Sequence, residues 1–152
     1  MSFFIGIDLG TSGCRAIAIN EQEELIASSK RLFSNPTPNS KSRFQDPMLW
    51  WGEVQETLTL LSKKINFQEV LSICVDGTSS TTLLCDSTGS TCSPALMYND
   101  NQCTAEARLI DHVAPDDSIA RGPGSSLAKL LFLQHHTSNA RYALHQEDWI
   151  LG

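Results

Sequence analysis

A strand that ends in a carboxylate and then turns over small residues opens the chain and limits its fold more than any other feature. Residues 3–20 read FFIGIDLGTSGCRAIAIN: an apolar strand, Asp8, a Gly-Thr-Ser-Gly turn at 10–13, and a second apolar strand. Glycines permit positive φ and close backbone approach, and the turn supplies N–H groups and hydroxyls as donors. Asp8 can hold Mg²⁺, because hard cations prefer oxygen ligands. The pattern predicts a phosphate and metal site, so phosphoryl transfer is the first hypothesis.

An ordinary β-hairpin is the alternative interpretation of this segment, since two strands joined by a glycine-containing turn need no ligand. Asp8 favours the functional interpretation. It follows a run without any other polar side chain, where a carboxylate with no role would be costly to bury. We therefore expect a buried strand that carries Asp8 at its end.

The composition is that of a globular protein and gives no sign of a nucleic-acid or membrane partner. The 152 residues fit one domain, and a chain of this length can bury about two-thirds of its unfolded surface. The net charge is −6 and the basic residues are scattered, which argues against binding to nucleic acid or anionic membranes. No apolar run reaches the roughly 18 residues that span a bilayer, and no basic region precedes Phe3 as in a signal peptide. The expected compartment is the cytoplasm.

The cysteines predict free thiols and no metal centre. They form no CxxC pair, and the four histidines show no ligand spacing with them. We expect reduced, mostly buried thiols at Cys14, Cys74, Cys85, Cys92 and Cys103.

Periodicity and turn residues predict three strands, a loop, a helix, further strands and then helices. The strands are expected at 3–7, 16–19, 25–33, 70–75, 81–85 and 94–98, the loop at 35–43, and later helices at 102–113 and 125–136. Asp46 as N-cap and Pro47 at the first helical position open the first helix. Its apolar stripe from Trp50 to Ile65 indicates burial against a sheet.

A second strand also ends in a carboxylate and a turn of hydroxyl residues. Strand 70–75 leads into Asp76, and Gly-Thr-Ser-Ser follows at 77–80. Ligands bind at strand ends in open α/β sheets, so the two sites suggest a cleft with phosphate on one side and a polyol on the other. The groups that would meet a sugar belong to Ser79, Ser80, Tyr98, Asn99 and Asp100. Turn capping explains Asp76 and Ser80 equally well.

Several segments of the chain together resemble a known family. GIDLGTSG is similar to the first phosphate motif of the actin-like ATPase superfamily, and the whole chain resembles the start of an FGGY-family carbohydrate kinase. The segments DPMLWW, VDGTSSTTLLCDSTG, PALMYND, SSLAKLLFL and HQEDWILG carry this resemblance together. The pattern is closest to the D-ribulose kinase-like branch, which has similar DGTSGT, YN and SSLAKL segments. The glycerol kinase branch has Arg-Glu in place of Ser79-Ser80, which argues against glycerol as substrate. Many relatives also have Trp and Arg where this chain has Tyr98 and Gln102.

The resemblance implies a ribonuclease-H-like α/β domain, with a mixed sheet and flanking helices, as the amino-terminal half of a two-lobed kinase. Asp8 would be the catalytic residue that positions Mg²⁺ and the transferring phosphate. Gly10, Thr11, Ser12 and Gly13 would bind the phosphates of ATP.

The implied substrate is a ketose held by Ser79, Ser80, Tyr98 and Asp100. The reaction would convert ATP and D-ribulose into ADP and D-ribulose 5-phosphate, mainly by positioning and charge neutralisation. A xylulose kinase or another polyol kinase is the alternative within this class.

The resemblance also implies parts that residues 1–152 do not contain. In the family, the general base and most adenine contacts lie further along, so we expect an incomplete FGGY amino-terminal domain that lacks its carboxy-terminal lobe in cis and is inactive alone. Apolar surface left uncovered would favour self-association. A non-catalytic sugar- or nucleotide-sensing module is the hypothesis from another class. A reading frame that continues past Gly152 would support the enzyme, and a stop codon there would favour the module.

Overall fold

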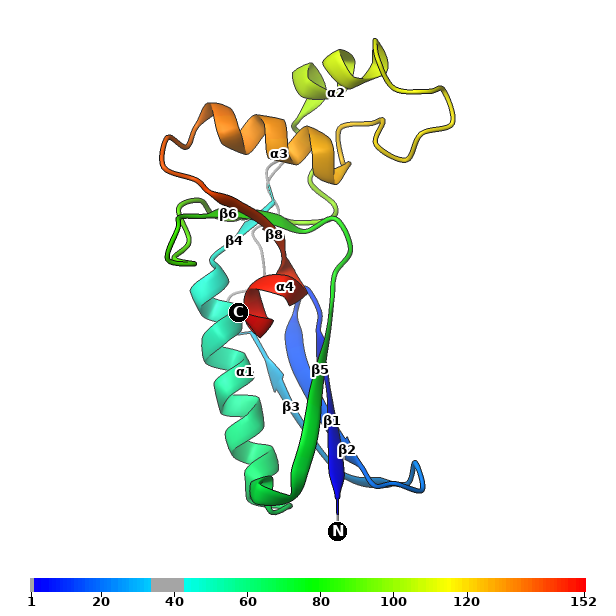
Figure 1. The fold of residues 1–152 in the computed structure, drawn as a ribbon, viewed down its shortest axis with the longest axis vertical. Coiled ribbons are helices and arrows are strands. Elements are labelled where there is room, and N and C mark those ends of the chain that lie inside the picture. Colours follow the sequence, from blue (N-terminus) through cyan, green and yellow to red (C-terminus); the bar gives the residue numbers. More distant parts are fainter. Residues whose placement is uncertain (1, 34–42) are drawn as a thin grey trace.

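The computed structural model describes residues 2–33 and 43–152, which form two four-stranded sheets with helices packed on them (Figure 1). The first half contains β1 (Phe3–Leu9), β2 (Gly13–Ile19), β3 (Leu25–Leu32), β4 (Phe44–Gln45), α1 (Pro47–Ser62), a 3₁₀ turn (Phe67–Glu69) and β5 (Val70–Gly77). The second half contains β6 (Thr82–Cys85), β7 (Ala95–Leu96), α2 (Thr104–Asp111), α3 (Ser126–His135), β8 (Tyr142–His145) and α4 (Gln146–Leu151). The predicted loop at 35–43 lies outside the described residues except for Arg43.

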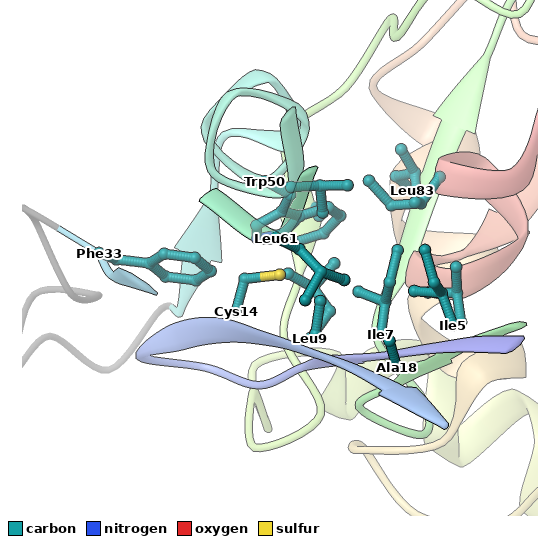
Figure 2. Close-up of a cluster of buried hydrophobic side chains, with 14 of the residues drawn as sticks. Ile5, Ile7, Leu9, Cys14, Ala18, Phe33, Trp50, Leu61 and Leu83 are labelled. Atoms are coloured by element: carbon teal, nitrogen blue, oxygen red, sulfur yellow. The ribbon is translucent and has the colours of Figure 1, made fainter. Parts of the chain in front are cut away.

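The first sheet is mixed and has the order β3-β2-β1-β5. Strands β1 and β2 are antiparallel, as are β2 and β3, whereas β1 and β5 are parallel. Alternate residues of β1 (Phe3, Ile5, Ile7 and Leu9) are buried on the face that α1 covers. Figure 2 shows Ile7 and Leu9 of this face on the same side of the sheet as Trp50 and Leu61 of the helix. Full burial of each large apolar side chain contributes about 1.5–3 kcal/mol, so this contact anchors the sheet.

Helix α1 begins where the sequence predicts. The Asp46 carboxylate accepts a hydrogen bond from the Met48 N–H at 2.9 Å, and Pro47 occupies the first turn. Trp50, Val54 and Leu61 form the buried stripe, while Trp51 lies at the exposed rim. None of the helices in the described ranges is long and apolar enough to cross a membrane.

The second sheet is antiparallel, has the order β4-β7-β6-β8, and separates two cores. All four residues of β6 are buried, because Leu83 and Cys85 pack toward α1 and the first sheet while Leu84 packs against α2 and α3. Figure 1 shows α2 and α3 at the end of the molecule opposite the N-terminus. Strands β4 and β8 and helix α4 were not predicted as elements from the sequence.

The five thiols are free, as expected. Cys14, Cys85 and Cys103 are buried, and Cys92 is half-buried. Cys74 is the exception to the expected burial: it is exposed on the outer face of β5, the face that α1 does not cover.

Candidate functional site

The two acidic strand ends lie side by side. In the parallel pair β1–β5, Asp8 is opposite Asp76 and Leu9 is opposite Gly77. Parallel neighbours end at the same edge of a sheet, so the turn after Asp8 and the turn after Asp76 leave the sheet together. The structure therefore unites the two sites that the sequence presents 68 residues apart.

Asp8 is exposed, which corrects the expectation of a carboxylate at a buried strand end. Ile7 and Leu9 occupy the core face of β1, so the alternation of a strand turns Asp8 to the outer face. A cavity of about 290 Å³ lies over this face, lined by Gly6, Ile7, Asp8, Arg15, Ile17, Cys74 and Asp76. Because Asp8 is exposed, the cost of burying a carboxylate gives no argument for a functional role. The argument for such a role rests on the position of Asp8 beside Asp76.

Asp76 is also exposed, and among residues 2–33 and 43–152 no hydrogen bond reaches its carboxylate. Turn capping, the alternative for Asp76, is therefore not its role within the described contacts.

Two carboxylates on one face supply hard oxygen ligands, the kind that Mg²⁺ prefers, with water and phosphate completing its shell. No group of three acidic, histidine or cysteine side chains forms a metal cluster in the described ranges. The residues fit an ion shared with a phosphate better than a site built wholly from protein ligands.

The turn after Asp8 is a tight hairpin with a close backbone approach. Its first residue, Gly10, donates its N–H to the Gly13 carbonyl at 3.0 Å, and the Ser12 carbonyl accepts from the Phe33 N–H at 2.9 Å. A Cβ at Gly13 would collide with the Arg31 carbonyl oxygen of β3. Glycine at position 13 is thus needed for strand packing, whatever the turn binds. The hairpin interpretation and the functional one are compatible.

Buried side chains hold this turn from the core. Gln45 Nε2 donates to the Thr11 carbonyl at 2.8 Å, and Gln45 Oε1 accepts from the Trp50 indole N–H at 2.7 Å. The hydroxyls of Thr11 and Ser12 have no hydrogen-bond partner in the described part of the chain. The turn is fixed through its carbonyls, which leaves hydroxyl donors available to an anion.

The turn after Asp76 is held in a similar way. Thr78 donates its backbone N–H and its hydroxyl to Oε1 of the buried Gln146, at 2.9 and 3.0 Å. Its hydroxyl also lies 2.6 Å from Thr81 Oγ1, which accepts the Tyr98 N–H at 3.1 Å. Helix α4 and the segment after β7 are therefore joined to this turn.

The residues predicted to bind sugar lie on these two joined segments. Ser79 is exposed and Ser80 is half-buried in a left-handed conformation, with φ of 59°. Tyr98 is 47% exposed. Three of the four predicted substrate residues can therefore reach a ligand, and their contact with a sugar remains a prediction.

Asp100, the fourth, is fully buried. Its carboxylate accepts the Arg43 N–H at 2.7 Å, and from Gln102 it accepts the backbone N–H at 2.9 Å and the side-chain amide at 3.0 Å. These hydrogen bonds connect the segment after β7 to Arg43 and Gln102, so Asp100 stabilises this segment. Its direct contact with substrate remains a prediction.

Three supporting residues were missed by the sequence reasoning: Gln45, Lys129 and Gln146. Each is a polar residue with less than a tenth of its surface exposed. Lys129 had a visible signal, since a lysine stands within the apolar run SLAKLLFL. The two glutamines had none, because glutamine is ordinary beside turns and helix starts.

Comparison with known proteins identifies the family. Residues 3–150 match the N-terminal domain of the FGGY family of carbohydrate kinases. The chain belongs to the FGGY family. The xylulose kinase of Escherichia coli (strain K12) is 31% identical over 137 residues, which cover 88% of this chain and 28% of that protein. The xylulose kinase of Klebsiella pneumoniae is 33% identical, with the same coverage.

Solved FGGY kinases share the fold. The crystal structure of xylulose kinase from Rhodospirillum rubrum superimposes with a TM-score of 0.80 at 21% identity, covering 97% of this chain and 33% of that one. The predicted α/β class with a mixed sheet, in the actin-like ATPase fold of FGGY kinases, is confirmed. The chain spans about a third or less of the relatives that it matches.

Proposed function

We propose that this chain is the sugar- and phosphate-binding part of an ATP-dependent kinase that phosphorylates a ketopentose. The parallel register of Asp8 and Asp76 carries the proposal, since it brings a phosphate-type turn and a hydroxyl-rich turn to one sheet edge. Phosphoryl transfer needs a charged site for phosphate next to a polar site for the accepting alcohol. The two turns supply these sites on neighbouring strands.

On the phosphate side, Asp8 is the proposed catalytic and metal-binding residue, with Asp76 beside it. Residues Gly10, Thr11, Ser12 and Gly13 are proposed to contact the phosphates of ATP through the turn. Bound Mg²⁺ would supply neutralisation of phosphate charge. The exposed carboxylates of Asp8 and Asp76 would hold the ion, and the core contacts of the turn would keep its hydroxyls in place.

On the sugar side, Ser79, Ser80 and Tyr98 are proposed to bind the ketose hydroxyls, with Asp100 holding their loop or contacting the sugar. D-ribulose, giving D-ribulose 5-phosphate, is our first candidate because residues 76–81 resemble the DGTSGT segment of the D-ribulose kinase-like branch. D-xylulose is the second candidate, supported by the relatives named above as xylulose kinases.

The proposed activity requires groups beyond residues 1–152, namely a general base and an adenine pocket. We propose that the chain works with a carboxy-terminal lobe in cis, in the cytoplasm, and is inactive alone.

Strand β5 lies at the edge of its sheet and exposes Leu71 and Ile73. This apolar surface supports contact with the rest of a kinase, and self-association when the chain is produced alone.

The test is a kinase assay of the complete protein that carries this sequence. With MgATP, D-ribulose, D-xylulose, glycerol and ribitol are offered separately, and ADP and sugar phosphate are measured. Turnover of a ketopentose in clear preference to glycerol is expected. Binding of ketose or nucleotide without turnover would overturn the kinase and favour a sensing module. Preference for glycerol or ribitol would overturn the ketopentose.

A further inference from the structure

One buried cation connects the two segments that carry the candidate sugar-binding residues. Lys129 lies in α3, whose first turn is capped by Ser125, and its side chain is fully buried. Its ammonium donates to the Ser80 carbonyl at 2.8 Å and to the Tyr98 carbonyl at 3.3 Å. This ammonium contacts both the turn after β5 and the segment after β7, and it adds a second link to the one between the Tyr98 N–H and Thr81 Oγ1.

The cost of burying this ammonium is offset by its hydrogen bonds to the Ser80 and Tyr98 carbonyls. A buried charge destabilises a fold unless it is hydrogen-bonded and compensated. Burial lowers the pKa of Lys129, and the negative charge of Asp100 opposes that shift. An apolar side chain would fill the same space in α3 without this cost, but it would leave the carbonyls of Ser80 and Tyr98 unpartnered.

Ser80 shows what the contact maintains. Its φ of 59° lies in the left-handed region, which a residue with a Cβ adopts only when its surroundings hold it there. The Thr81 N–H bonds to the Thr78 carbonyl at 3.2 Å within the turn, and Lys129 fixes the Ser80 carbonyl from outside. Lys129 therefore holds the backbone of the turn that carries the Ser79 and Ser80 hydroxyls.

We propose that Lys129 is a positioning residue for the ketose, setting the separation and orientation of the Ser79–Ser80 turn relative to Tyr98. The inference rests on the proposed function. Positioning errors near 1 Å cost about a hundredfold in rate when a reacting group is displaced, so a rigid link between two binding segments has a measurable effect. Lys129 touches backbone carbonyls of the site and needs no contact with the sugar itself.

The test uses Lys129→Met in the complete protein, which removes the ammonium and keeps most of the apolar stem. KM is measured for the ketose at saturating MgATP, and for ATP at saturating ketose. We expect the ketose KM to rise at least about tenfold, and the ATP KM to stay within about twofold, because the phosphate turn has its own tether through Gln45.

Lys64→Met is the matched control. Lys64 also donates to a backbone carbonyl, that of Ser28 at 2.5 Å, but on an exposed part of the first sheet. Both KM values should stay within about twofold of the wild type in this variant. A purely structural loss would lower the amount of folded enzyme, and therefore the apparent kcat, without changing the ketose KM.

An unchanged ketose KM in folded Lys129→Met would overturn the inference and leave the proposed function intact. If Lys129→Met does not fold, Lys129→Gln takes its place, since its amide can still donate to one carbonyl. A ketose KM raised severalfold supports the inference, and an unchanged one overturns it. Wild-type protein that turns over no ketopentose would overturn both proposals.

Discussion

The indole N–H of Trp50 donates to Gln45 Oε1 at 2.7 Å, and the same amide donates to the Thr11 carbonyl at 2.8 Å. The most buried part of α1 is therefore linked through one side chain to the turn that follows Asp8. Trp50 also meets Trp149 of α4 edge-on, with ring centroids 6.4 Å apart. The core thus fixes the turn at residues 10–13 through a backbone carbonyl and leaves the hydroxyls of Thr11 and Ser12 free of core hydrogen bonds in the described part of the chain.

Replacing Gln45 by leucine tests this link. Gln45→Leu leaves the Trp50 indole and the Thr11 carbonyl without their partner, and an unpaired buried polar group costs about 1–3 kcal/mol. The free energy of unfolding, from urea denaturation, should fall by about that amount. Gln55→Leu, on the exposed face of α1, should change it by less than about 0.5 kcal/mol. Equal effects of the two substitutions would show that the buried amide does not hold the turn.

Two glycines provide a matched pair. Gly13→Ala places a Cβ against the Arg31 carbonyl oxygen, so it should destabilise by about 1–3 kcal/mol through steric overlap. Gly52→Ala meets no atom within 4 Å in the middle of α1 and should stabilise by roughly 0.5–1 kcal/mol. Melting temperatures of the two variants should therefore move in opposite directions. A stabilising Gly13→Ala would contradict the close approach of β2 and β3.

Asp76 should take part in binding the metal. Because Asp76 is opposite Asp8 in the parallel register and lines the same cavity, Asp76→Asn should raise the Mg²⁺ concentration for half-maximal activity of the complete protein by about tenfold. Asp117→Asn, at an exposed position in the loop before α3, serves as the control and should leave the Mg²⁺ dependence unchanged. A wild-type Mg²⁺ curve for Asp76→Asn would remove Asp76 from the site.

Alkaline pH should weaken the fold partly through Cys103. Burial, aided by Asp100 and Glu106, raises the pKa of this thiol from 9.0 to about 11. As the pH rises, the Cys103 thiol ionises in the unfolded chain before it ionises in the folded protein, and this favours unfolding. The contribution of Cys103 to the free energy of unfolding is therefore fully present below pH 9 and is lost as the pH approaches 11. At pH 10 the loss is about 1 kcal/mol. Cys103→Ala should reduce the pH dependence of unfolding between pH 8 and 10 by that amount, whereas Cys74→Ala, an exposed thiol, should retain it. The same slope in Cys103→Ala and in the wild type would contradict the assignment.

Elements with strong local signals were predictable from the sequence. Asp46-Pro47 determines the start of α1, Ser125 caps α3, and the apolar runs around Asp8 form β1 and β2. In each case the residues that specify the element lie within it or next to it.

Features that depend on distant partners were not predictable. Strand β4 has two residues and exists because Phe44 and Gln45 pair with β7, and β8 forms by pairing with β6. The exposure of Asp8 follows from which face of β1 the helix covers. The roles of Gln45, Lys129 and Gln146 come from tertiary contacts with backbone groups, for which no local sequence pattern exists.

The activity of Asp8→Ala in the complete protein tests the central claim most directly. Asp8 is exposed, and no hydrogen bond reaches its carboxylate in the described part of the chain, so its removal should leave the fold intact. A circular dichroism spectrum and a melting temperature equal to those of the wild type would confirm this. We predict that phosphorylation of the preferred ketopentose with MgATP falls by at least about a thousandfold. A folded Asp8→Ala enzyme with activity within tenfold of the wild type would contradict the assignment of the strand end of β1 as the phosphate and metal site.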